Sequence, residues 1–163
     1  GLNGKGILAV IYAYTGQTLG TAPVGAKPTG IAFSKDQRLA YVVNSSGGNL
    51  TVVDTATMQP LGLIALGVSP QKIAATPDGK YLLATNKGSA TVSVIDATSN
   101  RVIRTISVGK GATDIKLSPD GSRAYVSNRD DGTISVIDMA TFAPVHVTDA
   151  MPRCSPIGLA VRP

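Results

Sequence analysis

The sequence predicts an all-β protein, a β-propeller built from four-stranded antiparallel blades of about 42 residues. The first observation is a repeat at a spacing of 42 residues, which is in the range of propeller blades. The second is that each unit holds four short segments rich in β-branched residues, separated by turn-forming residues. The third is composition: all ten acidic residues are Asp, and the 18 Gly and 10 Pro favour turns over helices.

Four sets of identical residues define the repeat. Each set recurs at the same spacing and in the same order along the chain, so insertions between the units are absent over most of its length. The sets are Gly25, Gly67 and Gly109; Ile31, Ile73 and Ile115; Asn44, Asn86 and Asn128; and Asp54, Asp96 and Asp138.

The first predicted strand of each unit is short, and a hairpin turn follows it. Thr76-Pro77-Asp78-Gly79 and Ser118-Pro119-Asp120-Gly121 place Pro, Asp and Gly where a type I hairpin turn needs them. Ala32, Ala74 and Ala160 share one position of this strand, and small residues are expected there because blades converge at the ring axis. The predicted first strands are 30–33, 72–75, 114–117 and 156–161.

The other three strands follow in order within each unit. Both faces of the third strand are largely apolar, which suits a sheet covered on both sides by neighbouring blades. The predicted second strands are 40–44, 82–86 and 124–128; the third strands are 7–14, 50–54, 92–96 and 134–138; and the fourth strands are 19–24, 61–66 and 103–108.

The strands at the two ends of the chain do not complete one blade between them. We therefore expect one propeller segment over 1–163, part of a ring of about six to eight blades. The expected partner is the remainder of a larger propeller, or further copies associating through open blade edges. The expected units are a partial blade at 1–27, blades at 28–69, 70–111 and 112–151, and the first strand of a next blade at 152–163.

The second strands carry a recognisable motif, in Tyr41-Val42-Val43-Asn44, Tyr125-Val126-Ser127-Asn128 and the weaker Leu83-Ala84-Thr85-Asn86. Its third-strand companion runs from Gly132 to Asp138. With these motifs the whole chain resembles the YVTN-repeat β-propeller family. The resemblance implies a periplasmic, cell-surface or secreted protein, because such repeats occur in surface-layer, periplasmic and secreted proteins. It implies no single chemistry, because related propellers include enzymes.

Composition excludes several classes of protein. No run of 18 apolar residues and no signal peptide is present, so we expect no membrane span. Two Phe, five Tyr and no Trp supply few stacking platforms, so we expect no nucleic-acid partner despite the net charge of +5.

Metal and catalytic sites are also poorly supplied. The single Cys154 and single His146 exclude multi-cysteine metal sites, and with Met151 they make only an incomplete copper-like set. No Gly-x-Ser-x-Gly motif is present. The sequence therefore predicts no metal, no cofactor and no catalytic residue in this chain.

The repeated polar residues have a structural interpretation. Each Asp of the set Asp54, Asp96 and Asp138 precedes a turn that contains Thr57, Ser99 or Thr141, and we expect it to hydrogen-bond the backbone of that turn. The repeated Asn residues are interpreted as turn residues that tolerate left-handed backbone angles. The acidic stretch 128–132 is interpreted as a solvated turn rather than a calcium loop.

Basic residues supply the candidate binding site. Lys116 stands where the other copies have a small residue, on the strand nearest the ring axis. We expect its ammonium group to reach the water of the central channel, a carboxylate such as Asp114, or a ligand. Loops leading into first strands share one end of the ring with loops joining second and third strands, and that end is expected to attract an anion. The alternative is that these are ordinary solubilising charges. The candidates are Lys27, Lys72, Lys87, Lys110, Lys116, Arg129 and Arg153.

A second departure from the repeat is the loop around Met151-Pro152-Arg153-Cys154, where the spacing lengthens to 44. Loops that interrupt a repeat often determine binding specificity.

The predicted function is a non-enzymatic extracytoplasmic scaffold that binds a protein, a surface polymer or a small anion. The alternative is part of a propeller enzyme or redox protein of lactonase-like, quinoprotein-like or cytochrome-associated type.

Overall fold

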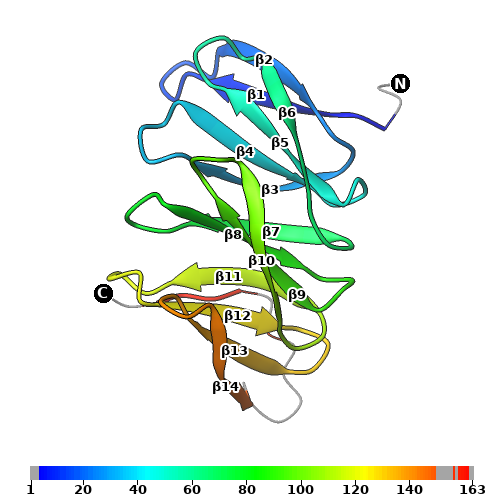
Figure 1. Ribbon diagram of the computed structural model, residues 1–163. Coiled ribbons are helices and arrows are strands. Elements are labelled where there is room, and N and C mark those ends of the chain that lie inside the picture. The colour runs from blue at the N-terminus through cyan, green and yellow to red at the C-terminus, as the bar shows by residue number, and fades with distance from the viewer. Residues whose placement is uncertain (1–3, 150–155, 157, 162–163) are drawn as a thin grey trace.

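The computed structural model describes residues 4–149, 156 and 158–161, and these residues form fourteen strands and no helix. The strands build one two-stranded and three four-stranded antiparallel sheets, which confirms the predicted all-β propeller fold (Figure 1). A helix able to cross a membrane is absent from this described part.

Each four-stranded sheet is a simple meander, in which consecutive strands pair. The two-stranded sheet contains β1 (Gly6–Ile11) and β2 (Thr18–Val24). The next sheet contains β3 (Pro28–Phe33), β4 (Leu39–Asn44), β5 (Asn49–Asp54) and β6 (Pro60–Ala65). The third contains β7 (Pro70–Ala75), β8 (Tyr81–Asn86), β9 (Thr91–Asp96) and β10 (Arg101–Ser107). The fourth contains β11 (Ala112–Leu117), β12 (Arg123–Asn128), β13 (Thr133–Asp138) and β14 (Ala143–Asp149).

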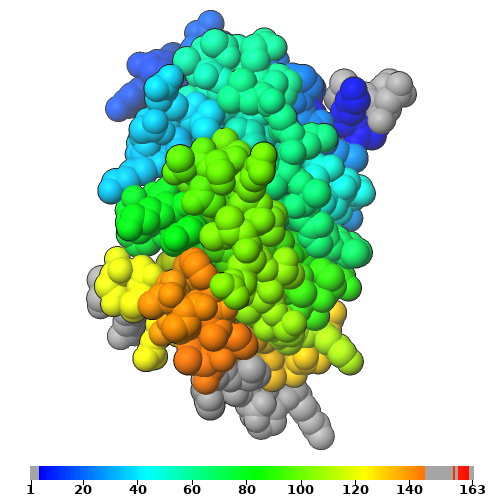
Figure 2. Space-filling view, viewed as in Figure 1, coloured from blue at the N-terminus to red at the C-terminus, as the bar shows by residue number. Residues whose placement is uncertain are grey.

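The sheets stack in chain order around an axis. First strands β3, β7 and β11 are neighbours on the inner side, and the fourth strands β6, β10 and β14 form the outer rim. Figure 2 shows these outer strands following one another across the visible surface.

One predicted strand is shorter than expected. Strand β1 ends at Ile11, because Tyr12 begins a turn in which its carbonyl accepts the Gly16 N–H at 2.8 Å.

The hydrophobic core lies between sheets rather than inside them. One cluster, around Tyr41 and Ile95, joins the second sheet to the third, and another, around Leu83 and Ile137, joins the third to the fourth. A smaller cluster that includes Leu8 joins β1 and β2 to the second sheet. The second and third sheets are thus covered on both faces by their neighbours, as the apolar third strands predict.

The predicted hairpin turns are confirmed. The Gly79 N–H donates to the Thr76 carbonyl at 2.9 Å, and Gly79 has a φ of 78°. Gln37 takes the same left-handed conformation in the first copy, with a φ of 60°. Glycine is favoured at this position because it adopts positive φ without steric cost.

The interpretation of the repeated Asn residues is wrong. Asn44, Asn86 and Asn128 are fully buried at the ends of second strands, and the left-handed residues lie four positions later, at Gly48, Ala90 and Gly132. The side chain of each Asn instead joins two strands, as the contacts of Asn86 show. Its Nδ2 donates to Thr91 Oγ1 at 3.1 Å and to Ser93 Oγ at 2.9 Å, and its Oδ1 accepts the Gly67 N–H at 3.1 Å.

The interpretation of the repeated Asp residues is confirmed. Asp96 Oδ1 accepts the Ser99 N–H at 2.7 Å and the Ser99 hydroxyl at 2.8 Å, and Asp54 and Asp138 repeat the pattern with Thr57 and Thr141. These backbone and hydroxyl hydrogen bonds lower the pKa of all three carboxyl groups, because they favour the charged form.

The two repeated tyrosines differ in burial. Tyr41 is fully buried, and its hydroxyl donates to Asn100 Oδ1 at 3.0 Å, whereas Tyr125 is only half-buried.

The described residues near the C-terminus lie beside β11. The Thr113 hydroxyl donates to the Pro156 carbonyl at 3.5 Å, and the equivalent Thr29 hydroxyl donates to the Pro70 carbonyl at 3.3 Å. The first strand of a next blade, predicted over 152–163, lies largely outside the described residues, and those that are described, 156 and 158–161, form no strand. The rest of that unit stays a prediction.

Candidate functional site

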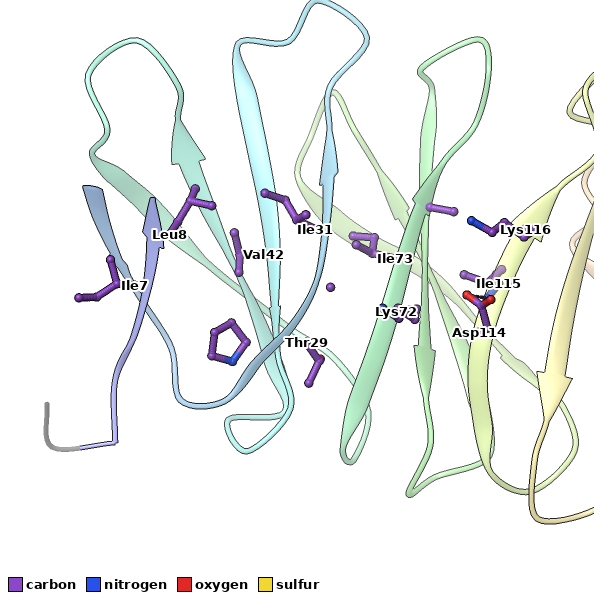
Figure 3. A pocket seen from close by; sticks show the side chains of 13 residues that line it. Ile7, Leu8, Thr29, Ile31, Val42, Lys72, Ile73, Asp114, Ile115 and Lys116 are labelled. Carbon is purple, nitrogen blue, oxygen red and sulfur yellow. Dashed lines mark hydrogen bonds between the residues drawn. The ribbon is translucent and has the colours of Figure 1, made fainter. Parts of the chain in front are cut away.

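A cavity of about 550 Å³ lies where the inner strands of successive sheets meet (Figure 3). It has two parts, which we name by their residues. The apolar part is formed by Ile7, Leu8, Ile31 and Val42, from β1, β3 and β4. The axial lysine site is formed by Lys72 of β7 with Asp114 and Lys116 of β11. The volume is in the range of small-molecule sites.

A strand irregularity positions two of the three charged residues. In each first strand the pairing register shifts, between Pro28 and Gly30, between Pro70 and Ile73, and between Ala112 and Asp114. Lys72 and Asp114 lie in the second and third of these irregularities. Such bulges redirect a side chain and are common next to binding sites.

Hydroxyl groups on the adjacent strand hold both irregular residues. The Lys72 N–H donates to Thr85 Oγ1 at 3.1 Å, and the Asp114 N–H donates to Ser127 Oγ at 3.1 Å. The equivalent residue in the first copy, opposite Gly30, is Val43, which has no hydroxyl. Thr85 and Ser127 are therefore positioning residues that the sequence analysis missed. The signal available in the sequence is that a hydroxyl residue occurs in the copies whose inner residue is charged.

Asp114 offsets only one of the two lysine charges, and its oxygens accept backbone N–H groups. Its Oδ1 accepts the Ile115 N–H and its Oδ2 accepts the Leu159 N–H, both at 2.9 Å. Lys72 and Lys116 are exposed to the cavity, and the ion pair found among the described residues joins Lys80 to Asp78 at 3.8 Å. Of the alternatives expected for Lys116, an ion pair with Asp114 is not found among the described residues. With two lysines and one carboxylate, the axial lysine site keeps a net positive charge.

The structure brings the predicted loop residues to one end of the ring. The Lys87 N–H donates to the Ser69 carbonyl at 3.1 Å, which joins a loop between second and third strands to a loop leading into a first strand. The same pairing joins Ser45 to Lys27 at 2.9 Å. It also joins Arg129 to Gly111, beside Lys110, at 3.0 Å. Lys27, Lys87, Lys110 and Arg129 therefore share this loop end.

One predicted loop feature differs from expectation and another agrees with it. Lys72 is not a loop residue, because it lies inside β7 and lines the cavity. At the loop end, Asp131 Oδ2 accepts the Lys110 N–H at 2.6 Å, so this carboxylate stabilises the turn. This contact is in line with the interpretation of 128–132 as a solvated turn rather than a calcium loop.

Several candidates lie outside the described residues. Arg153, Met151 and Cys154 belong to that part of the chain, and only the backbone of His146 is described, in β14 opposite Val136. The copper-like set and the lengthened loop are therefore untested. Elsewhere in the described part, His, Cys, Asp and Glu side chains do not gather in groups that could hold a metal ion.

Comparison with known families gives one match. The profile of a family described as "Cytochrome D1 heme domain" matches residues 5–114, which is more than half of the chain and includes β1 to β10 and the start of β11. No curated protein matches the chain.

Solved structures share the fold. Hydrazine synthase of Kuenenia stuttgartiensis is similar with a TM-score of 0.83 and 26% identity, over 87% of this chain and 42% of that one. The dihydro-heme d1 dehydrogenase NirN, solved in complex with DHE, has a TM-score of 0.72 and 18% identity, over 86% and 32%. A functionally unknown protein of Desulfotomaculum acetoxidans has a TM-score of 0.74 and 14% identity, over 87% and 49%. The chain thus spans less than half the length of these neighbours.

Proposed function

The chain belongs to the cytochrome D1 heme domain family, and from that premise we propose that it forms part of the wall of a heme-associated propeller whose axial lysine site binds carboxylate groups of the macrocycle. The family match is the observation that carries this proposal. It supports the cytochrome-associated alternative better than the non-enzymatic scaffold. The family that matches the chain is also not the YVTN-repeat family that its second-strand motifs resemble. As part of this proposal, the protein is placed outside the cytoplasm, as its sequence also leads us to expect.

The axial lysine site suits an acidic ligand edge. Heme-type macrocycles are flat and apolar and carry carboxylate side chains. Lys72 and Lys116 present two ammonium groups to one cavity, and both oxygens of Asp114 are already occupied by backbone N–H groups. Charge-assisted hydrogen bonds from lysine to carboxylate are stronger than neutral ones, particularly where protein walls limit water. Ile73 and Ile115 also line this cavity.

The described lining does not fit the heme iron. None of the described residues that line the cavity is His, Cys, Met or Tyr, the side chains that hold heme iron in proteins. When bound, a heme would supply electron-transfer chemistry, and the residues of this cavity would bind and orient its periphery. Lys72 and Lys116 are assigned to that task.

The experiment is a titration of the chain with metal-free protoporphyrin, a macrocycle with two carboxylates, followed by visible absorption. Replacing Lys72→Gln together with Lys116→Gln is expected to weaken binding about tenfold or more, and added salt is expected to weaken it in the unmodified chain. The matched control is Lys80→Gln with Arg123→Gln, two basic residues on another part of the ring, which should leave binding unchanged. Equal losses from both pairs would contradict the assignment of the axial lysine site.

A further inference from the structure

Three Asp-Gly pairs occur in the chain, Asp78-Gly79, Asp120-Gly121 and Asp131-Gly132. Such a pair can lose water when the glycine nitrogen attacks the carboxyl carbon of the aspartate, because glycine has no side chain to shield its nitrogen. Exposure does not distinguish the three pairs, since each Asp is exposed and each Gly is half-buried with a positive φ. Their hydrogen bonds do distinguish them.

The pairs in the two hairpin turns are held by hydrogen bonds at both reacting groups. In Asp78-Gly79 the glycine N–H donates to the Thr76 carbonyl at 2.9 Å, and the carboxylate accepts the Thr76 hydroxyl at 2.6 Å and the N–H two residues further along at 3.0 Å. Asp120-Gly121 repeats these contacts with Ser118. The hydroxyl and N–H groups lower the pKa of both carboxyl groups, so less of the neutral acid that loses water is present.

The third pair leaves both reacting groups less constrained. Asp131 Oδ2 accepts the Lys110 N–H at 2.6 Å, whereas Asp131 Oδ1 and the Gly132 N–H have no hydrogen-bond partner among the described residues. The N–H groups of Gly48 and Ala90, at the same position of the earlier copies, have no partner there either, so an unpaired N–H is typical of this position in the fold. Reactions within one chain depend strongly on how freely the reacting atoms can align.

We propose that Asp131-Gly132 is a site of spontaneous isomerisation, at which Asp131 becomes isoaspartate in the folded chain. The Gly132 nitrogen forms a bond to Asp131 Cγ, and the carboxyl hydroxyl leaves with the amide hydrogen as one water molecule. One water then opens the resulting succinimide ring. Opening at the side-chain carbonyl restores Asp131, and opening at the main-chain carbonyl gives isoaspartate, so no oxidant or reductant is needed. The proposal is independent of the proposed function.

The product changes the loop end without changing its charge. The main chain of isoaspartate runs through the side-chain carbon, which adds one methylene group to the backbone and moves the carboxylate that accepts the Lys110 N–H. We therefore expect the Lys110 amide to lose this hydrogen bond and to exchange faster with solvent. The modification thus alters the turn beside two candidate binding residues, Lys110 and Arg129.

The test maps isoaspartate in the whole chain after incubation at neutral pH, by proteolytic digestion and electron-transfer dissociation mass spectrometry. The folded chain is expected to contain about tenfold or more isoaspartate at 131 than at 78 or 120. In concentrated urea the turn hydrogen bonds are lost, so the three pairs should react at similar rates. Hydrogen exchange at Lys110 should be faster in the isoaspartate form.

The second copy of the repeat supplies matched variants, because Ser89 and Ala90 occupy the positions of Asp131 and Gly132. Ser89 Oγ accepts the Val68 N–H at 3.3 Å, as Asp131 Oδ2 accepts the equivalent N–H, and Ala90 has a φ of 52°. Gly132→Ala should therefore keep the fold and slow isomerisation about tenfold, because the added Cβ shields the nitrogen. Ser89→Asp with Ala90→Gly should create a new isoaspartate site at 89.

Several results would overturn the proposal. They are equal isoaspartate at the three pairs of the folded chain, a difference between the pairs that persists in urea, an unchanged rate at 131 in Gly132→Ala, and no isoaspartate at 89 in the folded double variant. The comparison among the three natural pairs needs no substitution, so it decides the proposal even where a variant fails to fold.

Discussion

The side-chain amide of Asn86 donates to Ser93 Oγ at 2.9 Å, in a fully buried position between two strands of one sheet. The same contact joins Asn44 to Thr51 and Asn128 to Ser135. The Asn of the repeat therefore fixes the register of second and third strands, and its replacement should be costly because buried partners would remain unpaired.

Replacing Asn86→Ala should lower the free energy of unfolding by about 2 kcal/mol, because Ser93 Oγ and the Gly67 N–H lose a buried partner. Urea denaturation followed by circular dichroism gives this value. Gln59→Ala, at an exposed position, is the control and should change stability by less than about 0.5 kcal/mol. A loss of that small size for Asn86 would contradict the structural role.

Tyr41→Ala should lower the free energy of unfolding by about 3 kcal/mol or more, since the ring is fully buried between sheets. Tyr41→Phe should cost about 1 kcal/mol through loss of the hydrogen bond to Asn100. Tyr125→Ala should cost less than Tyr41→Ala, because Tyr125 is only half-buried. Equal losses for the two alanine variants, measured by the same denaturation, would show that burial in this structure does not decide their contributions.

The chain should lose stability as the pH falls from about 4 towards 2. Hydrogen bonds from Ser118 and Ser122 lower the pKa of Asp120 to about 2, whereas an unfolded Asp titrates near about 3.9. A carboxyl group with a lowered folded pKa stabilises the fold above its unfolded pKa, and this contribution is lost as the pH falls through the folded pKa. The pKa values of five further turn carboxyl groups are lowered, at Asp36, Asp54, Asp78, Asp96 and Asp138.

Thermal unfolding at pH 6, 4, 3 and 2 checks this. Asp120→Ala should lower the melting temperature at pH 6 and reduce the difference between pH 6 and pH 2. Gln59→Ala, an exposed position without an ionisable group, is the control and should leave the pH dependence unchanged. The explanation fails if the Asp120 and Gln59 variants have the same pH profile.

The loop end should bind polyanions more strongly than the end that holds the Pro-Asp-Gly turns. Lys27→Glu with Lys110→Glu should weaken binding of poly-aspartate in titration calorimetry at low salt, since both side chains are exposed at this end. Lys80→Glu with Arg123→Glu serves as the comparison at the opposite end. Equal losses would indicate general attraction by the net charge rather than a docking end.

The fold was predictable because the strand and turn signals of each blade recur in every repeat. Apolar third strands, hairpin turns and Asp-capped turns recur at one spacing, and each has a local physical cause. The role of Asn44 and its equivalents was not predictable from turn propensity, because it depends on which hydroxyl lies opposite once the strands pair. The periodicity of Thr51, Ser93 and Ser135, two residues into the third strand, is the signal that could have revealed it.

The candidate site was predictable only in part. Lys116 stands out as a break in a small-residue position, but the placement of Lys72 beside it depends on a strand irregularity held by Thr85. Charge counting alone places Lys72 with the loop residues. The hydrogen bond from the Leu159 N–H to Asp114 could not be predicted from the sequence either, because the two residues are 45 positions apart.

The measurement that tests the central claim most directly compares two macrocycles with the same ring, of which one carries two carboxylates and the other carries two methyl esters. The chain is titrated with protoporphyrin and with its dimethyl ester, which keeps the ring and removes both carboxylates. If Lys72 and Lys116 bind the acidic edge of a heme-type ligand, protoporphyrin should bind at least about tenfold more tightly at low salt, and the difference should shrink in Lys72→Gln with Lys116→Gln. Equal affinities for the two macrocycles, or an unchanged difference in the variant, would contradict the account.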